Sequence, residues 1–185
     1  MRILAISGSL RAGGANNAVL DAARRLAPPG VEITHYAGLR ALPAFDPDLD
    51  TIAGDALPQE AAQLRAAVGR ADALLLSSPE YAHGIAGAFK NALDWLVGSV
   101  EFPGKPVALL NASAHAVHAH AQLVEVLTTM NARLVPEASI VVHVGGRSVA
   151  GRPFDGPAVA ADAALGGALR GALRALCDAV ASRAR

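Results

Sequence analysis

One stretch of the chain does most to decide its fold, and it runs Ser77-Ser-Pro-Glu-Tyr-Ala-His-Gly-Ile-Ala-Gly-Ala-Phe-Lys-Asn-Ala-Leu-Asp-Trp95. It follows Asp72-Ala-Leu-Leu-Leu76, an apolar run of the length of a buried strand. It leads into residues 89–97, whose apolar positions have helical spacing. A Pro-Glu-Tyr turn therefore stands at the carboxyl end of a strand. Open α/β sheets bind their ligands at such ends, so this stretch predicts both a fold class and a site.

The same alternation of strand and helix patterns extends over the rest of the chain. We predict strands at residues 2–7, 31–36, 73–78, 107–111 and 139–144, and helices at 16–26, 59–70, 85–97, 118–131 and 158–182, the last interrupted near Gly166-Gly167. Residues 38–58 and 145–157 are rich in Pro or Gly and are predicted to be loops. Alternating strands and helices form a parallel sheet with helices on both faces.

We therefore predict the α/β class, as a flavodoxin-like three-layer sandwich with a five-stranded parallel sheet in the order 2-1-3-4-5. Residues 1–185 are expected to form a single domain. In this strand order the chain reverses direction between strands 1 and 3. A crevice is therefore expected beside Gly8 and Pro79, where these two strands end.

The composition is that of a dense globular chain, with 52% hydrophobic and 17% charged residues. Lys+Arg and Asp+Glu each total 16, a balance that gives no reason to expect a nucleic-acid partner. No apolar run approaches the roughly 18 residues of a membrane span, and no signal peptide is recognisable before Gly8. We expect no membrane association and a cytoplasmic location. Cys177 is the single cysteine and is expected to be a buried structural thiol.

The loop after the first strand has the composition of a phosphate site. It opens a helix, whose N-terminal N–H groups favour an anion. Gly13 and Gly14 allow the backbone to approach that anion closely, Ser9 and Asn16 can donate hydrogen bonds, and Arg11 adds a charged donor. The loop fits neither the dinucleotide nor the Walker A pattern. An ordinary strand–helix turn with Asn16 as the N-cap remains the alternative.

Three histidines follow the fourth strand, and their spacing does not favour a metal site. His115, His118 and His120 stand at i, i+3 and i+5, with no acidic partner until Glu125. Helical metal pairs prefer i, i+4 spacing. We therefore predict no metal site here. Histidines that face a ligand pocket and histidines that face solvent both remain open.

The helix predicted at residues 85–97 has two kinds of surface. Ile85, Phe89, Leu93 and Leu96 form an apolar stripe that is expected to pack in the core. The residues Lys90, Asn91, Asp94 and Trp95 lie off that stripe. They form either a solvated face or a contact surface with another subunit.

Three segments resemble motifs of the NAD(P)H-dependent FMN reductase family, which includes quinone, azo-dye and chromate reductases. Residues 79–96 resemble its "PEYN…KNAxDWL" block, residues 8–20 its "GSLRxxSxNxxL" loop and residues 42–49 its "LPxYDxDL" segment. The resemblance implies that FMN binds at the strand ends. It also implies that residues 42–49 lie near the active-site rim or a subunit contact, and that Trp95 belongs to the interface of a homodimer or homotetramer.

The resemblance also implies which residues contact the cofactor. Gly14 stands where the family has a second serine, which leaves its backbone amide as the donor, and Ala82 stands where the family has an asparagine. In the loop after the fourth strand, His115 replaces part of a glycine-rich stretch whose amides contact the flavin. The expected FMN-binding residues are Ser9, Arg11, Gly14, Ala15, Asn16, Pro79, Glu80, Tyr81, Ala82, Ser113 and His115.

By this resemblance the chain is an FMN-dependent NAD(P)H oxidoreductase. NADPH or NADH would pass a hydride to FMN, which would reduce a small-molecule electron acceptor such as a quinone, an azo compound, chromate or free flavin. Hydride transfer needs positioning and electrostatics rather than a protein nucleophile, so no catalytic residue is expected. Two alternatives remain: a flavodoxin-like electron carrier, and a flavodoxin-like binding protein that has lost FMN through the changes at Gly14, Ala82 and His115.

Overall fold

The computed structural model describes residues 1–51, 56–144, 148–149 and 152–183. The strands are β1 (Arg2–Ser7), β2 (Glu32–His35), β3 (Ala73–Ser77), β4 (Glu80–Tyr81), β5 (Gly84–Ile85), β6 (Pro106–Asn111), β7 (Arg133–Leu134), β8 (Ile140–Val141), β9 (Ser148–Val149) and β10 (Arg152–Pro153). The α-helices are α1 (Ala15–Arg25), α2 (Gln59–Arg70), α3 (Gly87–Val97), α4 (Val117–Thr129), α5 (Gly156–Ala161) and α6 (Ala163–Arg183).

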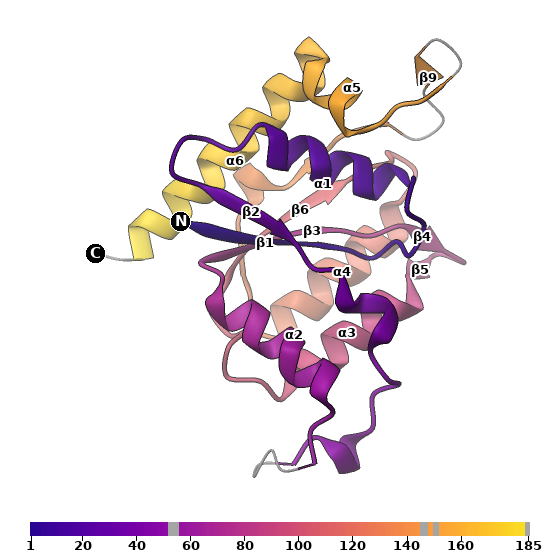
Figure 1. The fold of residues 1–185 in the computed structure, drawn as a ribbon, viewed down its shortest axis with the longest axis vertical. Helices are drawn as coiled ribbons and strands as arrows, with labels where there is room; N and C mark the ends of the chain where they lie inside the picture. The colour runs from indigo at the N-terminus through magenta and orange to yellow at the C-terminus, as the bar shows by residue number, and fades with distance from the viewer. Residues whose placement is uncertain (52–55, 145–147, 150–151, 184–185) are drawn as a thin grey trace.

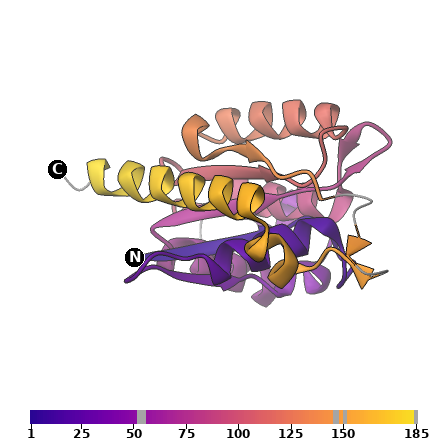
Figure 2. The ribbon, with the colours of Figure 1, turned by 90° about the horizontal axis from the view of Figure 1, so that it is seen from above.

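The main sheet is parallel and has the strand order β2-β1-β3-β6-β7, with β8 also pairing with β6. The predicted order 2-1-3-4-5 is confirmed, because β6 is the fourth main strand and β7 with β8 occupies the fifth position. The N-terminus and the end of α6 lie at one end of the molecule, and the β4–β5 hairpin lies at the other, where the parallel strands end (Figures 1 and 2).

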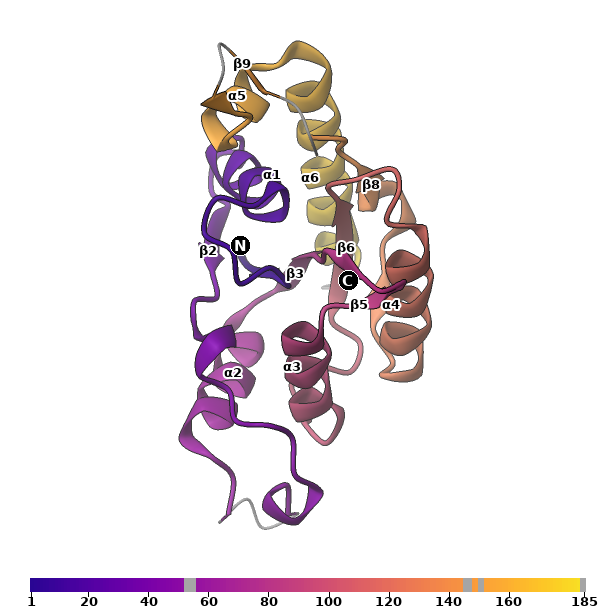
Figure 3. The same ribbon diagram turned by 90° about the vertical axis from the view of Figure 1, so that its right-hand side faces the viewer.

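Helices cover both faces of the sheet, and alternate strand residues face the two helix layers. In β1, Leu4 and Ile6 belong to the core under α2, α3 and α4, and Ile3 and Ala5 belong to the core under α1, α5 and α6. Figure 3 shows the two helix layers on opposite sides of the sheet. The period of two in side-chain direction explains why these strands are apolar throughout, and the three-layer sandwich is confirmed.

The fifth strand differs from the prediction of one continuous strand at 139–144. The edge consists of β7 and β8, separated by a short 3-10 helix at Pro136–Ala138. Pro136 has no N–H to donate to the sheet. Just after it, the Ser139 hydroxyl accepts a hydrogen bond from the N–H of Leu109 at 3.1 Å, where a backbone carbonyl would otherwise act. The edge strand is therefore interrupted at Pro136, which cannot donate a backbone hydrogen bond to β6.

The final helix breaks at Asp162, and the predicted interruption at Gly166-Gly167 is wrong. Asp162 lies between α5 and α6, and its Oδ1 accepts hydrogen bonds from the N–H groups of Ala164 and Leu165, both at 3.0 Å. An Asp that caps a new helix outweighs two glycines that the helix tolerates inside it. The neighbouring loop prediction at 145–157 falls partly outside the described residues, and the described part includes β9 and β10.

Two further features qualify the sequence-based predictions. The predicted loop at 38–58 contains short 3-10 helices at Gly38–Ala41 and Pro47–Leu49, and residues 52–55 lie outside the described residues. Cys177 is partly buried in α6 rather than enclosed in the core. Within the described ranges, no helix is both long and apolar enough to cross a bilayer.

Candidate functional site

The ends of β1 and β3 bring two of the predicted loops together. Ser7 pairs with Ser77 in the sheet, and the N–H of Gly8 donates to the Ser77 carbonyl at 2.7 Å. A Cβ atom on Gly8 would lie 3.0 Å from both the Phe89 Cβ and the Ser78 Oγ. A side chain at this position would crowd both neighbours, so glycine suits the point where the first loop leaves the sheet beside the second loop and α3.

The first loop is held in shape by its own side chains and by a neighbouring arginine. Asn17 Nδ2 donates to the carbonyl oxygens of Arg11 at 2.7 Å and Ala12 at 3.3 Å. Arg40 donates to the Leu10 carbonyl at 2.9 Å. Neither residue was among the predicted site residues, although an asparagine within reach of a loop carbonyl is a familiar turn signal. The Arg11 side chain itself is exposed.

Asn16 lies inside α1 and is not its N-cap, so the alternative assignment is wrong. The N-cap is Gly14, which provides no side-chain hydrogen bond to the helix. Asn16 is 8% exposed, and its Oδ1 accepts from the Ser77 hydroxyl at 2.8 Å. The same hydroxyl lies 2.7 Å from the Leu110 carbonyl, so these contacts hold the Asn16 amide against the ends of β3 and β6. The helix N-terminus beside it keeps its positive potential because no side chain caps it.

The backbone amide of Gly14, predicted to replace the missing serine, has a partner within the loop. It donates to the Arg11 carbonyl at 3.2 Å. The donors that face the start of the helix are therefore the N–H groups of its first turn and the side chain of Asn16.

The second loop forms a tight hairpin between β4 and β5, in which Glu80 pairs with Ile85 and Tyr81 with Gly84. The two residues of the turn, Ala82 and His83, have φ values of 49° and 58°. A two-residue turn of this handedness matches the twist of a hairpin. It is costly for residues with a Cβ.

The hairpin is attached to the first turns of α4. Glu80 Oε2 accepts a hydrogen bond from the N–H of Ala119 at 2.9 Å. Gln122 accepts from the N–H of Ile85 at 3.2 Å and donates to the His83 carbonyl at 3.3 Å. Glu80 thus places a negative charge at the N-terminal end of α4. Gln122 was not predicted to take part.

Hydrogen bonds from its backbone N–H groups hold the third loop, residues 112–116, in place. Ser113 donates its N–H to Asn111 Oδ1 at 3.1 Å, and its hydroxyl accepts from the N–H of His115 at 3.2 Å. The N–H of Ala114 donates to His143 Nδ1 at 3.2 Å. The N–H groups of Ser113, Ala114 and His115, in the stretch expected to face the flavin, therefore have hydrogen-bond partners on the protein.

A cavity of about 340 Å³ opens where these three loops meet. Its lining includes six of the eleven predicted cofactor residues: Ala15, Asn16, Pro79, Glu80, Ser113 and His115. Ser78, Asn111, Ala112 and Ala116 also line it. Tyr81 and Ala82 are exposed in the hairpin and are not part of this lining. A larger hollow of about 740 Å³ lies on the other side of the first loop, against α1 and α5.

The three histidines that follow the predicted fourth strand lie apart in the structure. The His115 ring lies 6.0 Å from that of His143, in an edge-on arrangement. His118 stacks on His83, with ring centroids 4.3 Å apart, and His120 lines a small hollow beneath the helix. The group of His115, His118 and His120 considered from the sequence is therefore not assembled.

The polar residues of α3 attach residues 43–45 to the helix, which corrects the predicted contact surface. Trp95 is 0% exposed, and its indole N–H donates to the Pro43 carbonyl at 2.9 Å. Asn91 donates to the same carbonyl at 2.8 Å and accepts from the N–H of Phe45 at 2.7 Å. Trp95 is therefore buried within this chain and is not a surface for another subunit. Lys90 pairs with Asp94 on the outside.

The cavity and its donors fit a phosphate-bearing planar cofactor. An uncapped helix N-terminus and the amide of Asn16, both at the edge of the cavity, could supply donors for an anion. The cavity volume falls in the range of sites for small molecules. These residues therefore suit FMN: the start of α1 could hold its phosphate, and Pro79 and Ser113 belong to the lining that could hold its ring.

Comparison with known proteins relates the chain to a family of FMN reductases. Residues 1–146 match the model of a family described as NADPH-dependent FMN reductase. An NAD(P)H-dependent FMN reductase of Pseudomonas aeruginosa is 40% identical over 116 residues, which are 62% of this chain and 60% of the relative. A quinone reductase of Escherichia coli K12 is 30% identical over 115 residues, 61% of this chain and 60% of the relative. The matched region thus spans about 60% of the length of these curated relatives.

Solved structures extend the likeness over nearly the whole chain. FerB, a flavoenzyme NAD(P)H:(acceptor) oxidoreductase from Paracoccus denitrificans, has a TM-score of 0.76 and 26% identity, covering 98% of this chain and 97% of its own. The azoreductase AzrA, with a TM-score of 0.59 and 15% identity over 96% of this chain, shares the fold. Because the family model covers residues 1–146 of 185, the chain belongs to the NADPH-dependent FMN reductase family.

Proposed function

We propose that the chain is an FMN-dependent NAD(P)H oxidoreductase that reduces a small-molecule electron acceptor. The observation that carries this proposal is the opening of the uncapped N-terminus of α1 onto the 340 Å³ cavity, with the amide of Asn16 fixed at its edge. Membership of the family implies FMN and NAD(P)H. Whether NADPH or NADH is the better donor is part of the test.

Each loop has its own task in this proposal. The first loop binds the phosphate through Arg11, Asn16 and the first-turn amides of α1, with Ser9 beside them. Pro79 and Glu80 form one wall for the ring, and Glu80 fixes that wall to α4 through Ala119. The third loop forms the opposite wall, whose shape is set by its internal hydrogen bonds.

The chemistry needs little from the protein beyond this placement. Bound FMN supplies the hydride-transfer chemistry between NAD(P)H and the acceptor. The protein binds and orients the reactants in a partly enclosed cavity, and effective concentrations gained by such positioning account for large rate enhancements without a protein nucleophile. The exposed side of the hairpin, with Tyr81 60% exposed, leaves room for the donor and acceptor.

The remaining parts of the proposal concern the acceptor and the assembly. A quinone is the first acceptor to try, because a relative with 30% identity is a quinone reductase. Azo compounds, chromate and free flavin are the others. Homodimers or homotetramers are supported by two exposed apolar side chains, Val97 at the end of α3 and Val100 just after it, which are 62% and 88% exposed. We place residues 1–185 in one FMN-binding domain, and in the cytoplasm, where NAD(P)H is available.

A visible spectrum followed by a turnover assay tests this function. The purified chain is expected to show a flavin spectrum, or to acquire one when FMN is added, and to oxidise NADPH or NADH in the presence of a benzoquinone. Binding of FMN without turnover toward any of the four acceptor classes would instead assign an electron carrier. A chain that stays colourless with added FMN would assign a binding protein that has lost the cofactor.

A further inference from the structure

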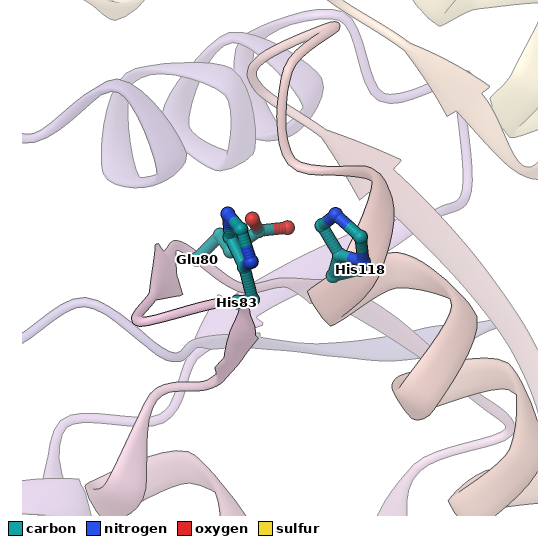
Figure 4. A group of neighbouring side chains, drawn as sticks. All are labelled: Glu80, His83 and His118. Carbon is teal, nitrogen blue, oxygen red and sulfur yellow. The ribbon is translucent and has the colours of Figure 1, made fainter.

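We propose that Glu80, His83 and His118 form a binding site for a divalent transition-metal ion at the rim of the cofactor cavity. One ligand atom from each of the three lies within 4.8 Å of the other two. Figure 4 shows the carboxylate of Glu80 directed toward the ring of His118, with His83 beside it. Metal binding at this place does not depend on FMN.

The three side chains come from two elements that are already joined. Glu80 and His83 belong to the β4–β5 hairpin, and His118 is in the first turn of α4. Gln122 and the Glu80–Ala119 hydrogen bond hold the hairpin against that helix. The ligand positions are therefore placed by the fold, and binding would order only side chains.

The distances require a small adjustment that the side chains can make. Ligand atoms about 2.0–2.2 Å from a tetrahedral zinc ion lie about 3.4 Å from one another. His83 and His118 are exposed and can rotate toward a common point, since they now stack with centroids 4.3 Å apart. Glu80 uses Oε2 for Ala119, and its other oxygen is available to a metal. A second-shell hydrogen bond of this kind orients a ligating carboxylate.

The turn that carries His83 is held in an unfavourable backbone conformation. Ala82 and His83 both have positive φ, which costs about 1–2 kcal/mol for a residue with a Cβ. This conformation directs His83 back toward α4, where the ring meets His118.

The donor set indicates which ions would bind. Two imidazoles and one carboxylate suit zinc, cobalt, nickel or copper, whereas magnesium and calcium prefer oxygen ligands alone. Three protein ligands leave at least one coordination position open. An ion here would therefore keep a water molecule or bind a small anion at the mouth of the cavity.

Titration with Co²⁺ near neutral pH tests the site on the full chain, with and without added FMN. We expect one Co²⁺ per chain and a visible ligand-field spectrum, and competition by Zn²⁺. His83→Ala and His118→Ala are each expected to weaken binding by more than about 100-fold, because removal of outer partners alone costs 10- to 100-fold. The matched control is His120→Ala, on the same helix but outside the group, which should bind as the parent does.

Three results would overturn the site. The first is the absence of a Co²⁺ spectrum in the parent chain, and the second is unchanged binding in His83→Ala and His118→Ala. The third is a loss in His120→Ala as large as that in His118→Ala, which would move the ion to the surface of α4. Circular dichroism of each variant shows that the fold is retained. Glu80→Gln, which keeps an acceptor for Ala119 but removes the carboxylate, should weaken Co²⁺ binding in a chain whose far-ultraviolet spectrum is unchanged.

Discussion

Trp95 donates its indole N–H to the carbonyl oxygen of Pro43, 52 positions earlier in the chain, at 2.9 Å. The ring also meets Phe45 edge-on, with centroids 5.0 Å apart. Asn91 shares the Pro43 carbonyl. Two residues of α3 thus hold residues 43–45 against the helix, and they do so inside one chain.

Trp95→Phe is expected to lower the free energy of unfolding by about 1–3 kcal/mol, because it removes buried volume and one hydrogen bond while Asn91 still satisfies the carbonyl. Urea unfolding at a fixed protein concentration measures it. Gln63→Ala, at an exposed position of α2, is the control and should change stability by less than about 0.5 kcal/mol. A Trp95→Phe chain that loses its oligomeric state at unchanged stability would restore the interface interpretation.

The sequence predicted the fold well because each main strand and helix has its own local pattern. Leu74 and Leu76 face one helix layer and Ala73 and Leu75 the other, so β3 is apolar throughout and was recognised without knowledge of its neighbours. The burial of Trp95 could not be predicted from its own helix. Residues 43–45 bury it, and helical periodicity carries no information about a distant loop.

The site was predicted less completely, for a similar reason. Asn16 and Glu80 were found because they lie in local motifs next to strand ends. The partners that set their geometry, Ser77 and Ala119, are 61 and 39 positions away in sequence. The group of Glu80, His83 and His118 was missed because the spacing rule compared histidines within one segment, and the fold brings His118 to another segment.

Ala82 is a position where replacement should stabilise the protein. Its φ of 49° lies in the left-handed region, where the Cβ of alanine causes steric strain and glycine, which has no Cβ, causes none. Ala82→Gly is expected to raise the free energy of unfolding by about 0.5–1 kcal/mol, and Ala82→Asn to raise it by a smaller amount, because asparagine tolerates this region. Thermal unfolding measures both.

The control for this prediction is Ala66→Gly, in the exposed middle of α2, where glycine should cost about 1 kcal/mol. Equal destabilisation by Ala82→Gly and Ala66→Gly would show that the turn is not left-handed in solution.

Cys177 should react slowly with alkylating agents. Burial, together with the neighbouring carboxylate of Asp178, raises the pKa of the thiol, so the reactive thiolate is scarcer at neutral pH than in a free cysteine. Iodoacetamide should modify the native chain about tenfold or more slowly than the urea-unfolded chain. Asp178→Asn removes one cause of the raised pKa and should speed the native reaction at constant pH. A native rate equal to the unfolded rate would contradict the burial of the thiol.

Gly14→Ser restores the hydroxyl that the family pattern has at this position. Its backbone, at φ −82° and ψ 155°, accepts any residue. A Cβ would meet Ser9 Oγ at 3.1 Å and the Arg11 carbonyl at 3.3 Å, so a small shift is needed. One added neutral hydrogen bond is worth about 0.5–1.5 kcal/mol, and FMN affinity should rise about two- to tenfold. Gly13→Ser, where a Cβ meets nothing within 4 Å, is the matched control and should leave FMN affinity unchanged.

Arg11→Ala should weaken FMN binding by about 10- to 100-fold, because a hydrogen bond to a charged group contributes about 1.5–3 kcal/mol. The guanidinium is exposed, so the difference between parent and variant should shrink as salt is added. Quenching of FMN fluorescence measures both the loss of affinity and its salt dependence.

The control is Arg24→Ala, which removes the same charge from the last turn of α1. This turn is at the end of the helix away from the loop, and there Arg24 pairs with Asp21. The control variant should change FMN affinity by less than about twofold, since a screened charge acts only within about 10 Å. Equal losses in the two variants would mean that Arg11 acts through overall charge and does not contact the phosphate.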